Sequence, residues 1–150
     1  MDNSDNILNE ILNLLNTQSF CVLATQAKEN PYCSLVAYAV SNNGKDIIFA
    51  TLRNTSKYEN LKQNPKISLL IDSRINQAED LKSAQALTVL GTAHDIKENL
   101  HGTYVELYLK KHPDLKEFVT KSDCALINVK VSKYILVSNF QNILEYSMKD

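Results

Sequence analysis

Apolar residues near the start of the chain recur at helical spacing. They follow Ser4 and Asp5, either of which can cap a helix, and the stripe ends close to Asn16. The pattern therefore predicts an amphipathic helix with one buried face. That face consists of Ile7, Leu8, Ile11, Leu12 and Leu15.

Farther along, short apolar runs bounded by turn residues predict six strands. Pro31 favours a turn between the first two, and Asn43 with Gly44 can adopt the positive φ of a hairpin turn before the third. The fourth run is apolar on both faces, as in a central strand covered on each side. The runs cover residues 19–25, 32–40, 46–51, 67–71, 87–93 and 125–137.

Helical spacing returns between these strands. Residues 55–64 and 97–111 predict helices that stop at Pro65 and Pro113, and a short helical turn follows from Leu115 to Phe118. Residues 73–83 are polar and predict a loop, and loops of that length tend to be functional or to meet a partner.

The order of these elements favours a mainly β fold with helices. Strands in hairpin order, decorated by helices, predict a closed six-stranded antiparallel barrel. A doubly wound parallel sheet is the alternative, but the first three strands are joined by turns too short for a parallel crossover. With no repeat or linker, residues 1–150 are expected to form a single domain.

Composition and charge exclude several classes of function. The chain of 150 residues is 44% hydrophobic and 22% charged, as expected of a soluble globular protein without a membrane-spanning segment. A net charge of -1 removes the basic surface that general nucleic-acid binding needs. Three glycines cannot supply a dinucleotide fingerprint or a P-loop. The N-terminus lacks the features of a secretory signal, so a cytoplasmic location is expected.

Neither cysteines nor histidines have the spacing of a metal site. The cysteines are odd in number and far apart, and we interpret them as buried small hydrophobes. The histidines lack a paired spacing and are interpreted as surface or capping residues, so no metal is predicted. These residues are Cys21, Cys33 and Cys124, and His94, His101 and His112.

Two cations stand at a strand-to-helix junction. Arg53 and Lys57 lie where the helix dipole and free backbone N–H groups disfavour a cation, and an anion would resolve the conflict. Together with the hydroxyls of Thr55 and Ser56, they predict a phosphate pocket. An alternative fits the spacing equally well: Ser56 and Glu59 form a capping box, and both cations point into water.

The second strand alternates two kinds of side chain. On one face, its small residues would let a flat ring lie close to the backbone; alternatively, Leu35, Ala37 and Ala39 fill a tapering barrel interior. Arg74, in the polar loop, is either solvated or reaches a ligand of a neighbouring subunit. The two faces carry Tyr32, Ser34, Val36 and Tyr38, and Cys33, Leu35, Ala37 and Ala39.

Several of these segments together resemble a known family. The most specific is T-x-R-x-T-x-K-Y-x-N-L, from Thr51 to Leu61, and it looks like the pyridoxamine 5'-phosphate oxidase-related family of FMN-binding split barrels. The resemblance covers nearly the whole chain. Its other parts are residues 31–36, 64–72, Arg74, residues 87–93, and Tyr134, Val137, Ser138, Phe140 and Gln141.

The resemblance implies a split barrel, a cofactor and an assembly. Such proteins are typically homodimers with two FMN molecules at the subunit interface. By the resemblance, Lys57 holds the FMN phosphate, and the second strand runs along the isoalloxazine ring. The other residues carried over are Thr51, Arg53, Thr55 and Ser56 for the phosphate, Ser34, Leu35 and Val36 for the ring, and Arg74 and Gln141 across the dimer.

Two departures from the family pattern bear on the reaction. The true oxidases place an arginine where Ser34 stands, and the C-terminal W-x(9)-R pattern of the oxidases proper is missing before Asp150. We therefore expect an FMN-dependent oxidoreductase with another small-molecule substrate, an electron donor such as NADH or NADPH, and catalytic residues that the sequence does not identify.

Three alternatives remain open at this point. The first is a haem-utilisation protein, which would need His94, His101 or His112 as an axial ligand. The second is a non-catalytic flavin-binding module, because a fold does not fix a function. The third is a deazaflavin in place of FMN.

Overall fold

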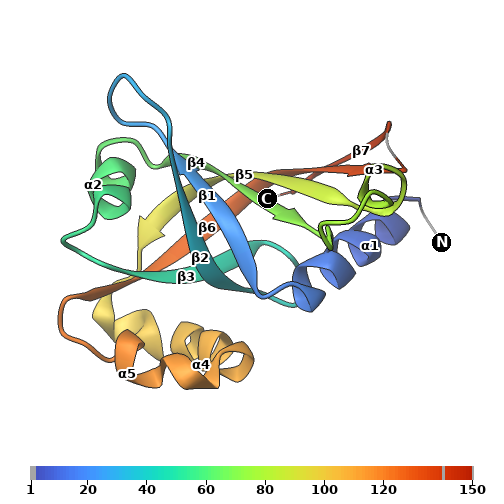
Figure 1. Cartoon of the computed structure of the whole chain (residues 1–150). Helices are drawn as coiled ribbons and strands as arrows, with labels where there is room; N and C mark the ends of the chain where they lie inside the picture. Colours follow the sequence, from blue (N-terminus) through green and yellow to red (C-terminus); the bar gives the residue numbers. More distant parts are fainter. Residues whose placement is uncertain (1–2, 140, 150) are drawn as a thin grey trace.

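The computed structural model describes residues 3–139 and 141–149, and its six long strands close into a barrel. The strands follow the order β3-β2-β1-β4-β5-β6, and β6 also pairs with β3, which closes the ring (Figure 1). All these pairings are antiparallel, so the expected six-stranded antiparallel barrel is confirmed. The strands are β1 (Phe20–Thr25), β2 (Tyr32–Val40), β3 (Asp46–Leu52), β4 (Lys66–Asp72), β5 (Ala86–Asp95) and β6 (Cys124–Ser138).

Helices cover the ends and one side of this barrel. In Figure 1, α2 and α1 lie at opposite ends of the sheet, and α4 and α5 lie together below β2 and β3. Two short 3-10 helices, η1 (Glu98–Leu100) and η2 (Pro113–Leu115), flank α4. The helices are α1 (Asn3–Thr17), α2 (Ser56–Gln63), α3 (Asp80–Ser83), α4 (His101–Lys111) and α5 (Lys116–Val119).

The barrel has an inner and an outer apolar core. The inner core contains fully buried rings whose hydroxyls are satisfied: Tyr38 donates to the Leu15 carbonyl at 2.7 Å, and Tyr134 donates to the Gly44 carbonyl at 2.7 Å. The outer core joins α4 to the outside of the sheet around Tyr108. Alternate residues of β2, β3 and β6 therefore enter different cores, as strand geometry requires.

This division corrects one interpretation of β2. Ala37 and Ala39 belong to the outer core under α4, and the Leu35 side chain is 70% exposed. None of the three fills the barrel interior. Val36 and Tyr38 occupy it instead, because odd and even positions of a strand face opposite sides.

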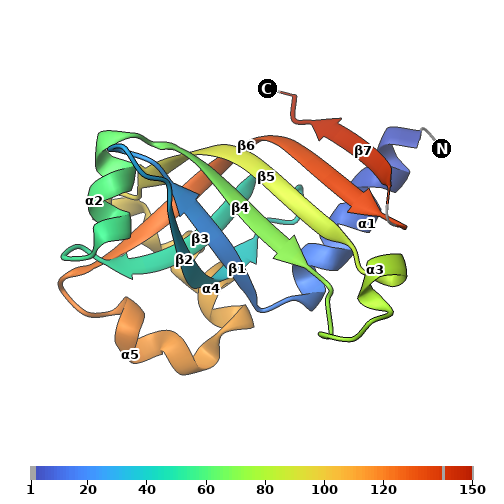
Figure 2. The ribbon, with the colours of Figure 1, turned by 45° about the horizontal axis from the view of Figure 1, so that its top comes forward.

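Other expectations need smaller corrections. A seventh strand, β7 (Asn142–Ser147), pairs with β6 and extends the sheet beside α1 (Figure 2). The expected loop over residues 73–83 contains α3. Cys33 is exposed, whereas Cys21 and Cys124 are buried as expected. Phe140 lies outside the described residues. Among those described, no helix is both long enough and apolar enough to cross a membrane.

Candidate functional site

Strands β2 and β3 pair with each other along only part of their length. In the described chain their pairing covers only Tyr38–Val40 with Ile47–Phe49. Beyond these residues β2 continues to pair with β1, and β3 continues to pair with β6. Each strand therefore has one edge on the gap, where backbone N–H and C=O groups can bind something other than a neighbouring strand.

A pocket of about 320 Å³ occupies this gap. Leu35, Val36 and Ala37 of β2 line one wall, and residues 50–52 of β3 line the other. The floor is made by Tyr108, Leu115 and Phe118, which come from α4, η2 and α5. Their helical spacing marks these three residues as apolar but does not show which surface they cover, so the sequence alone does not assign them to the pocket.

One end of the pocket is formed by the start of α2. Thr55 is the N-cap, and its Oγ1 accepts a hydrogen bond from the Tyr58 backbone N–H at 3.3 Å. The same oxygen donates to the Leu52 carbonyl at 2.8 Å and lies 3.0 Å from the Thr51 hydroxyl. The helix is therefore capped by Thr55, and the interpretation of Ser56 and Glu59 as the capping box is wrong.

Lys57 brings a cation to this end of the pocket. It stands in the first turn of α2, is half-buried, and lines the pocket together with Thr51 and Thr55. A lysine at a helix start gains nothing from the helix dipole, so an anion beside it would be favoured by both the ammonium and the free N–H groups. Five of the predicted residues thus share one pocket: Leu35, Val36, Thr51, Thr55 and Lys57.

Arg53 points elsewhere. Its Nη1 donates to the Cys124 carbonyl at 3.1 Å, and its Nη2 lies 3.6 Å from Asp95 Oδ1. The side chain lines a different cavity of about 320 Å³, beside His101 and Ser122. The structure therefore does not bring Arg53 and Lys57 to the same cavity.

Tyr58 completes the surroundings of Arg53. Its hydroxyl donates to Asp95 Oδ2 at 2.7 Å, and its ring centroid lies 6.0 Å from the Arg53 guanidinium carbon. Burial raises the pKa of Tyr58, and the hydrogen bond to Asp95 raises it further. The phenol therefore stays protonated and keeps donating to the carboxylate at neutral pH.

Two predicted serines differ in their surroundings. Ser34 Oγ is buried and has no hydrogen-bond partner within the described chain. Ser56 is exposed and lines a separate groove beside Tyr32 and Asn60. An unsatisfied buried hydroxyl is costly, so Ser34 is a site where a ligand or solvent group would be stabilised.

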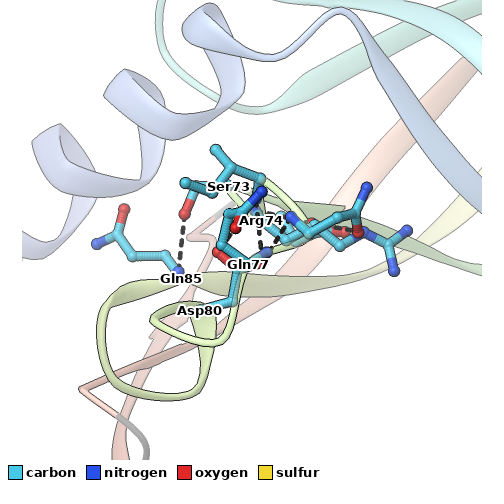
Figure 3. A network of polar contacts seen from close by, with 8 residues as sticks. Ser73, Arg74, Gln77, Asp80 and Gln85 are labelled. Atoms are coloured by element: carbon cyan, nitrogen blue, oxygen red, sulfur yellow. Dashed lines mark hydrogen bonds and ion pairs between the residues drawn. The ribbon is translucent and has the colours of Figure 1, made fainter.

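Arg74 belongs to a loop that is tightly held by its own side chains (Figure 3). The Asp80 carboxylate accepts hydrogen bonds from the backbone N–H groups of Ile75, Asn76 and Gln77. These bonds, that from Ile75 first, lower the pKa of Asp80. Arg74 itself pairs with Asp72 at 3.1 Å.

Arg74 and Gln141, the last two predicted residues, do not line the pocket between β2 and β3. Arg74 lines a groove with Phe20 and Leu35, and Leu35 also lines the pocket between β2 and β3. Gln141 is exposed and lies just before β7, and β7 runs at the end of the sheet opposite α2 (Figure 1). Within one chain, neither residue joins Lys57.

Histidines in the described chain do not line this pocket. His112 Nε2 lies 2.7 Å from the Tyr38 carbonyl, and His101 Nε2 lies 2.6 Å from the Ile96 carbonyl. Both rings therefore use one nitrogen to hold the backbone, and His94 is exposed near the end of β5.

Solved structures with the same fold bind different groups. The haem-binding protein from Mycobacterium smegmatis has a TM-score of 0.78 and 17% identity over 89% of this chain, and the chain spans 55% of its length. An FAD-binding protein from Mesorhizobium loti has a TM-score of 0.69 and 14% identity, covering 85% of this chain and 90% of that one. These identities show a shared fold alone.

A third structure is similar over the whole chain. It is a Clostridium acetobutylicum protein of the pyridoxinephosphate oxidase family, related to general stress protein 26 of B. subtilis, with a TM-score of 0.73 and 15% identity over 99% of this chain and 97% of that one. A search of curated proteins finds no match. The family model described as pyridoxamine 5'-phosphate oxidase matches residues 7–138. Since that match covers most of the sequence, the chain belongs to the pyridoxamine 5'-phosphate oxidase family.

Proposed function

We propose that this chain binds FMN in the pocket between β2 and β3 and acts as a flavin-dependent oxidoreductase. The observation that carries the proposal is the polarity of this pocket. One end holds Lys57 with the hydroxyls of Thr51 and Thr55, and the rest is bounded by strand edges and an apolar floor. A molecule with a phosphate at one end and a flat, mostly apolar ring system at the other matches that distribution.

The residues present fit such a cofactor. Lys57 and the first N–H groups of α2 would hold the phosphate, because both favour a negative charge. Thr51 would add a hydroxyl donor, whereas Thr55 already donates its proton to the Leu52 carbonyl and Ser56 lines a separate groove. Ser34 does not line this pocket, so its unpartnered Oγ is not assigned to the cofactor.

The chain would fix the pose of the ring. The free edge of β2 beside the pocket would offer backbone N–H and C=O groups to the polar rim of the ring, while the floor from α4, η2 and α5 would exclude water beneath it. When bound, the flavin supplies the redox chemistry, and the protein supplies its position and surroundings. The substrate would be a small molecule, with NADH or NADPH as a cytoplasmic electron donor.

The outer surface of the barrel supports a homodimer. Phe20 on β1, Leu35 on β2 and Leu70 on β4 are 59%, 70% and 39% exposed, and Leu35 and Leu70 both pair with Val22 in register. We call these three side chains the apolar patch. A second copy packed here would cover the open side of the pocket at Leu35. It would also explain why Arg74 and Gln141 are separated from Lys57, since each would then serve the site of the other copy.

The ligand can be identified directly. Denaturing the freshly purified protein should release a molecule with the two absorbance bands of a flavin and the mass of FMN. Release of haem or FAD, or of no flavin from protein that also fails to bind added FMN, would overturn the proposal. Reduction of the bound flavin by NADH or NADPH in a stopped-flow instrument then separates an oxidoreductase from a non-catalytic module.

Lys57 provides the sharper test. Lys57→Met should weaken FMN binding by about 10- to 100-fold and leave riboflavin binding unchanged, because the lost charge pairs with the phosphate alone. The matched control is Lys97→Met, which removes the same charge from an exposed position before η1. Equal FMN affinity of Lys57→Met and the wild type would rule out the phosphate assignment.

A further inference from the structure

Arg53 joins three segments that lie far apart in the sequence. Its backbone N–H donates to the Asp123 carbonyl at 2.9 Å, and its Nη1 donates to the Cys124 carbonyl at 3.1 Å, at the start of β6. Its Nη2 lies 3.6 Å from Oδ1 of Asp95, at the end of β5. The guanidinium thus contacts both the end of β5 and the start of β6.

Asp95 also contacts α2, through Tyr58. Its second oxygen, Oδ2, accepts a hydrogen bond from the Tyr58 hydroxyl at 2.7 Å. The carboxylate therefore sits between the guanidinium and the phenol, with one oxygen for each. We call Arg53, Asp95 and Tyr58 the latch.

The latch ends next to Lys57. Tyr58 is 6% exposed, packs in the inner core and follows Lys57 directly in the first turn of α2. Its backbone N–H is held by the Thr55 cap, and its hydroxyl is held by Asp95. The first turn is therefore fixed on both sides of Lys57, which sets the direction in which the ammonium leaves the helix.

Geometry makes Arg53 the anchor of this arrangement. The ion pair with Asp95 is half-exposed and long, so by itself it contributes little. The two bonds to backbone groups at residues 123 and 124 hold Arg53 in place, and the guanidinium in turn holds Asp95 under the Tyr58 hydroxyl. A planar fork can reach the carbonyl and the carboxylate together, whereas a single ammonium cannot.

We infer that Arg53 is a positioning residue, which acts on the phosphate site through Asp95 and Tyr58 by fixing the first turn of α2 rather than by touching the phosphate. The inference rests on the proposed function where it names the phosphate. It gives Arg53 a different task from the one that the family resemblance implies, and it adds Asp95 and Tyr58 to the residues on which the site depends.

The first experiment compares FMN with riboflavin in fluorescence titrations of the apoprotein. Arg53→Met, Asp95→Asn and Tyr58→Phe should each weaken FMN binding by about threefold to tenfold and leave riboflavin binding unchanged. A general loss of fold would lower both affinities. Arg53→Met combined with Asp95→Asn should be no weaker than either single variant, because both break the same connection. Arg53→Lys should not restore binding.

If Arg53 instead contacts the phosphate directly, the expected effect of Asp95→Asn on FMN affinity is the opposite. If Arg53 touched the phosphate, Asp95→Asn would free the guanidinium, so FMN affinity would stay the same or rise. That result would overturn the inference, as would full additivity in the double variant.

The second experiment needs no flavin. In hydrogen exchange of the apoprotein, the amides of Tyr58 and Glu59, which donate to Thr55, should exchange about threefold to tenfold faster in Arg53→Met and in Asp95→Asn than in the wild type. The matched control is Lys133→Met, which breaks the ion pair of Lys133 with Glu145 at 2.9 Å on β6 and β7 and should leave α2 unchanged. Unchanged exchange in the latch variants would overturn the inference even if FMN binds. If exchange is faster in the latch variants but the protein binds no FMN, the positioning role of the latch is supported and the proposed function is wrong.

Discussion

At the scale of single residues, Gly91 stands where another side chain does not fit. A Cβ there would lie 2.7 Å from the Lys130 carbonyl oxygen and 2.7 Å from Val129 Cγ1, at the point where the register of β5 and β6 shifts. Gly91→Ala should lower the free energy of unfolding by about 2–3 kcal/mol in denaturant titrations, because the backbone of β6 cannot move aside cheaply.

Gly102 is the matched control for that substitution. Among the described residues, no atom outside the neighbouring helix backbone lies within 4 Å of a Cβ at this position of α4, so Gly102→Ala should leave stability unchanged or raise it by up to about 1 kcal/mol. Equal destabilisation by both substitutions would contradict the close approach of β5 and β6.

Lys111 gives a prediction about pH. Its Nζ donates to the Leu15 carbonyl at 3.0 Å and lies 3.8 Å from the centroid of the Tyr38 ring. Burial lowers the pKa of Lys111 from 10.5 to about 8, against a smaller opposing effect of Cys21. Between these two values the unfolded chain binds more protons at this residue than the folded chain does, so the contribution of Lys111 to stability rises with pH across that window and is constant below it.

Lys111→Met removes that rise. In denaturant titrations, the free energy of unfolding of the wild type minus that of the variant should be larger at pH 10 than at pH 7. The expected increase is about 1–2 kcal/mol, after allowance for solvent screening of a half-buried amine. Burial also raises the pKa of Cys21 to about 12, which costs both proteins stability above pH 9, and the difference largely removes this effect. A difference that is flat with pH would contradict the burial of the amine.

At the scale of elements, the loop that carries Arg74 depends on one carboxylate. Because Asp80 accepts three backbone N–H groups, Asp80→Asn should speed the hydrogen exchange of residues 75–77, whereas Asp114→Asn in η2 should not. The lowered pKa of Asp80 means that the charged form holds the loop, so acidification below the ordinary carboxyl range should lower the protection factors of the same amides in the wild type. Equal exchange in all three proteins would show that the loop is held by other contacts.

The elements also show what local pattern can and cannot predict. The six barrel strands alternate or run apolar between strong turn residues, so their sequence alone predicts them. Strand β7 was missed because it pairs only with β6 in the described chain and is half-exposed, which leaves a weak pattern. Thr55 and Lys57 belong to a local motif, so their place at the start of α2 could be predicted. The contact of Arg53 with Asp95 could not, because it depends on β5 ending beside α2 in the folded chain. The gap between β2 and β3 depends on where β3 leaves β2, and no local signal reports it.

At the scale of the whole molecule, the apolar patch predicts how two copies associate. Exposed side chains on three adjacent strands would be covered by a second copy, which favours association of two chains of 16.9 kDa. In light scattering after gel filtration, the wild type should have the mass of two chains. Phe20→Glu combined with Leu70→Glu should have the mass of one, because burying two carboxylates in an apolar contact is costly.

The same substitutions link assembly to the site. Leu35 lies both in the apolar patch and in the wall of the pocket, so separation of the copies should expose the open side of the pocket and weaken FMN and riboflavin binding alike, by about tenfold or more. That loss differs from the phosphate-specific loss expected of Lys57→Met. Leu100→Glu, on a leucine of η1 that is 57% exposed, should keep the mass of two chains and full affinity. A wild-type mass of one chain with tight FMN binding would show that a single barrel completes the site, and Arg74 and Gln141 would then have no part in it.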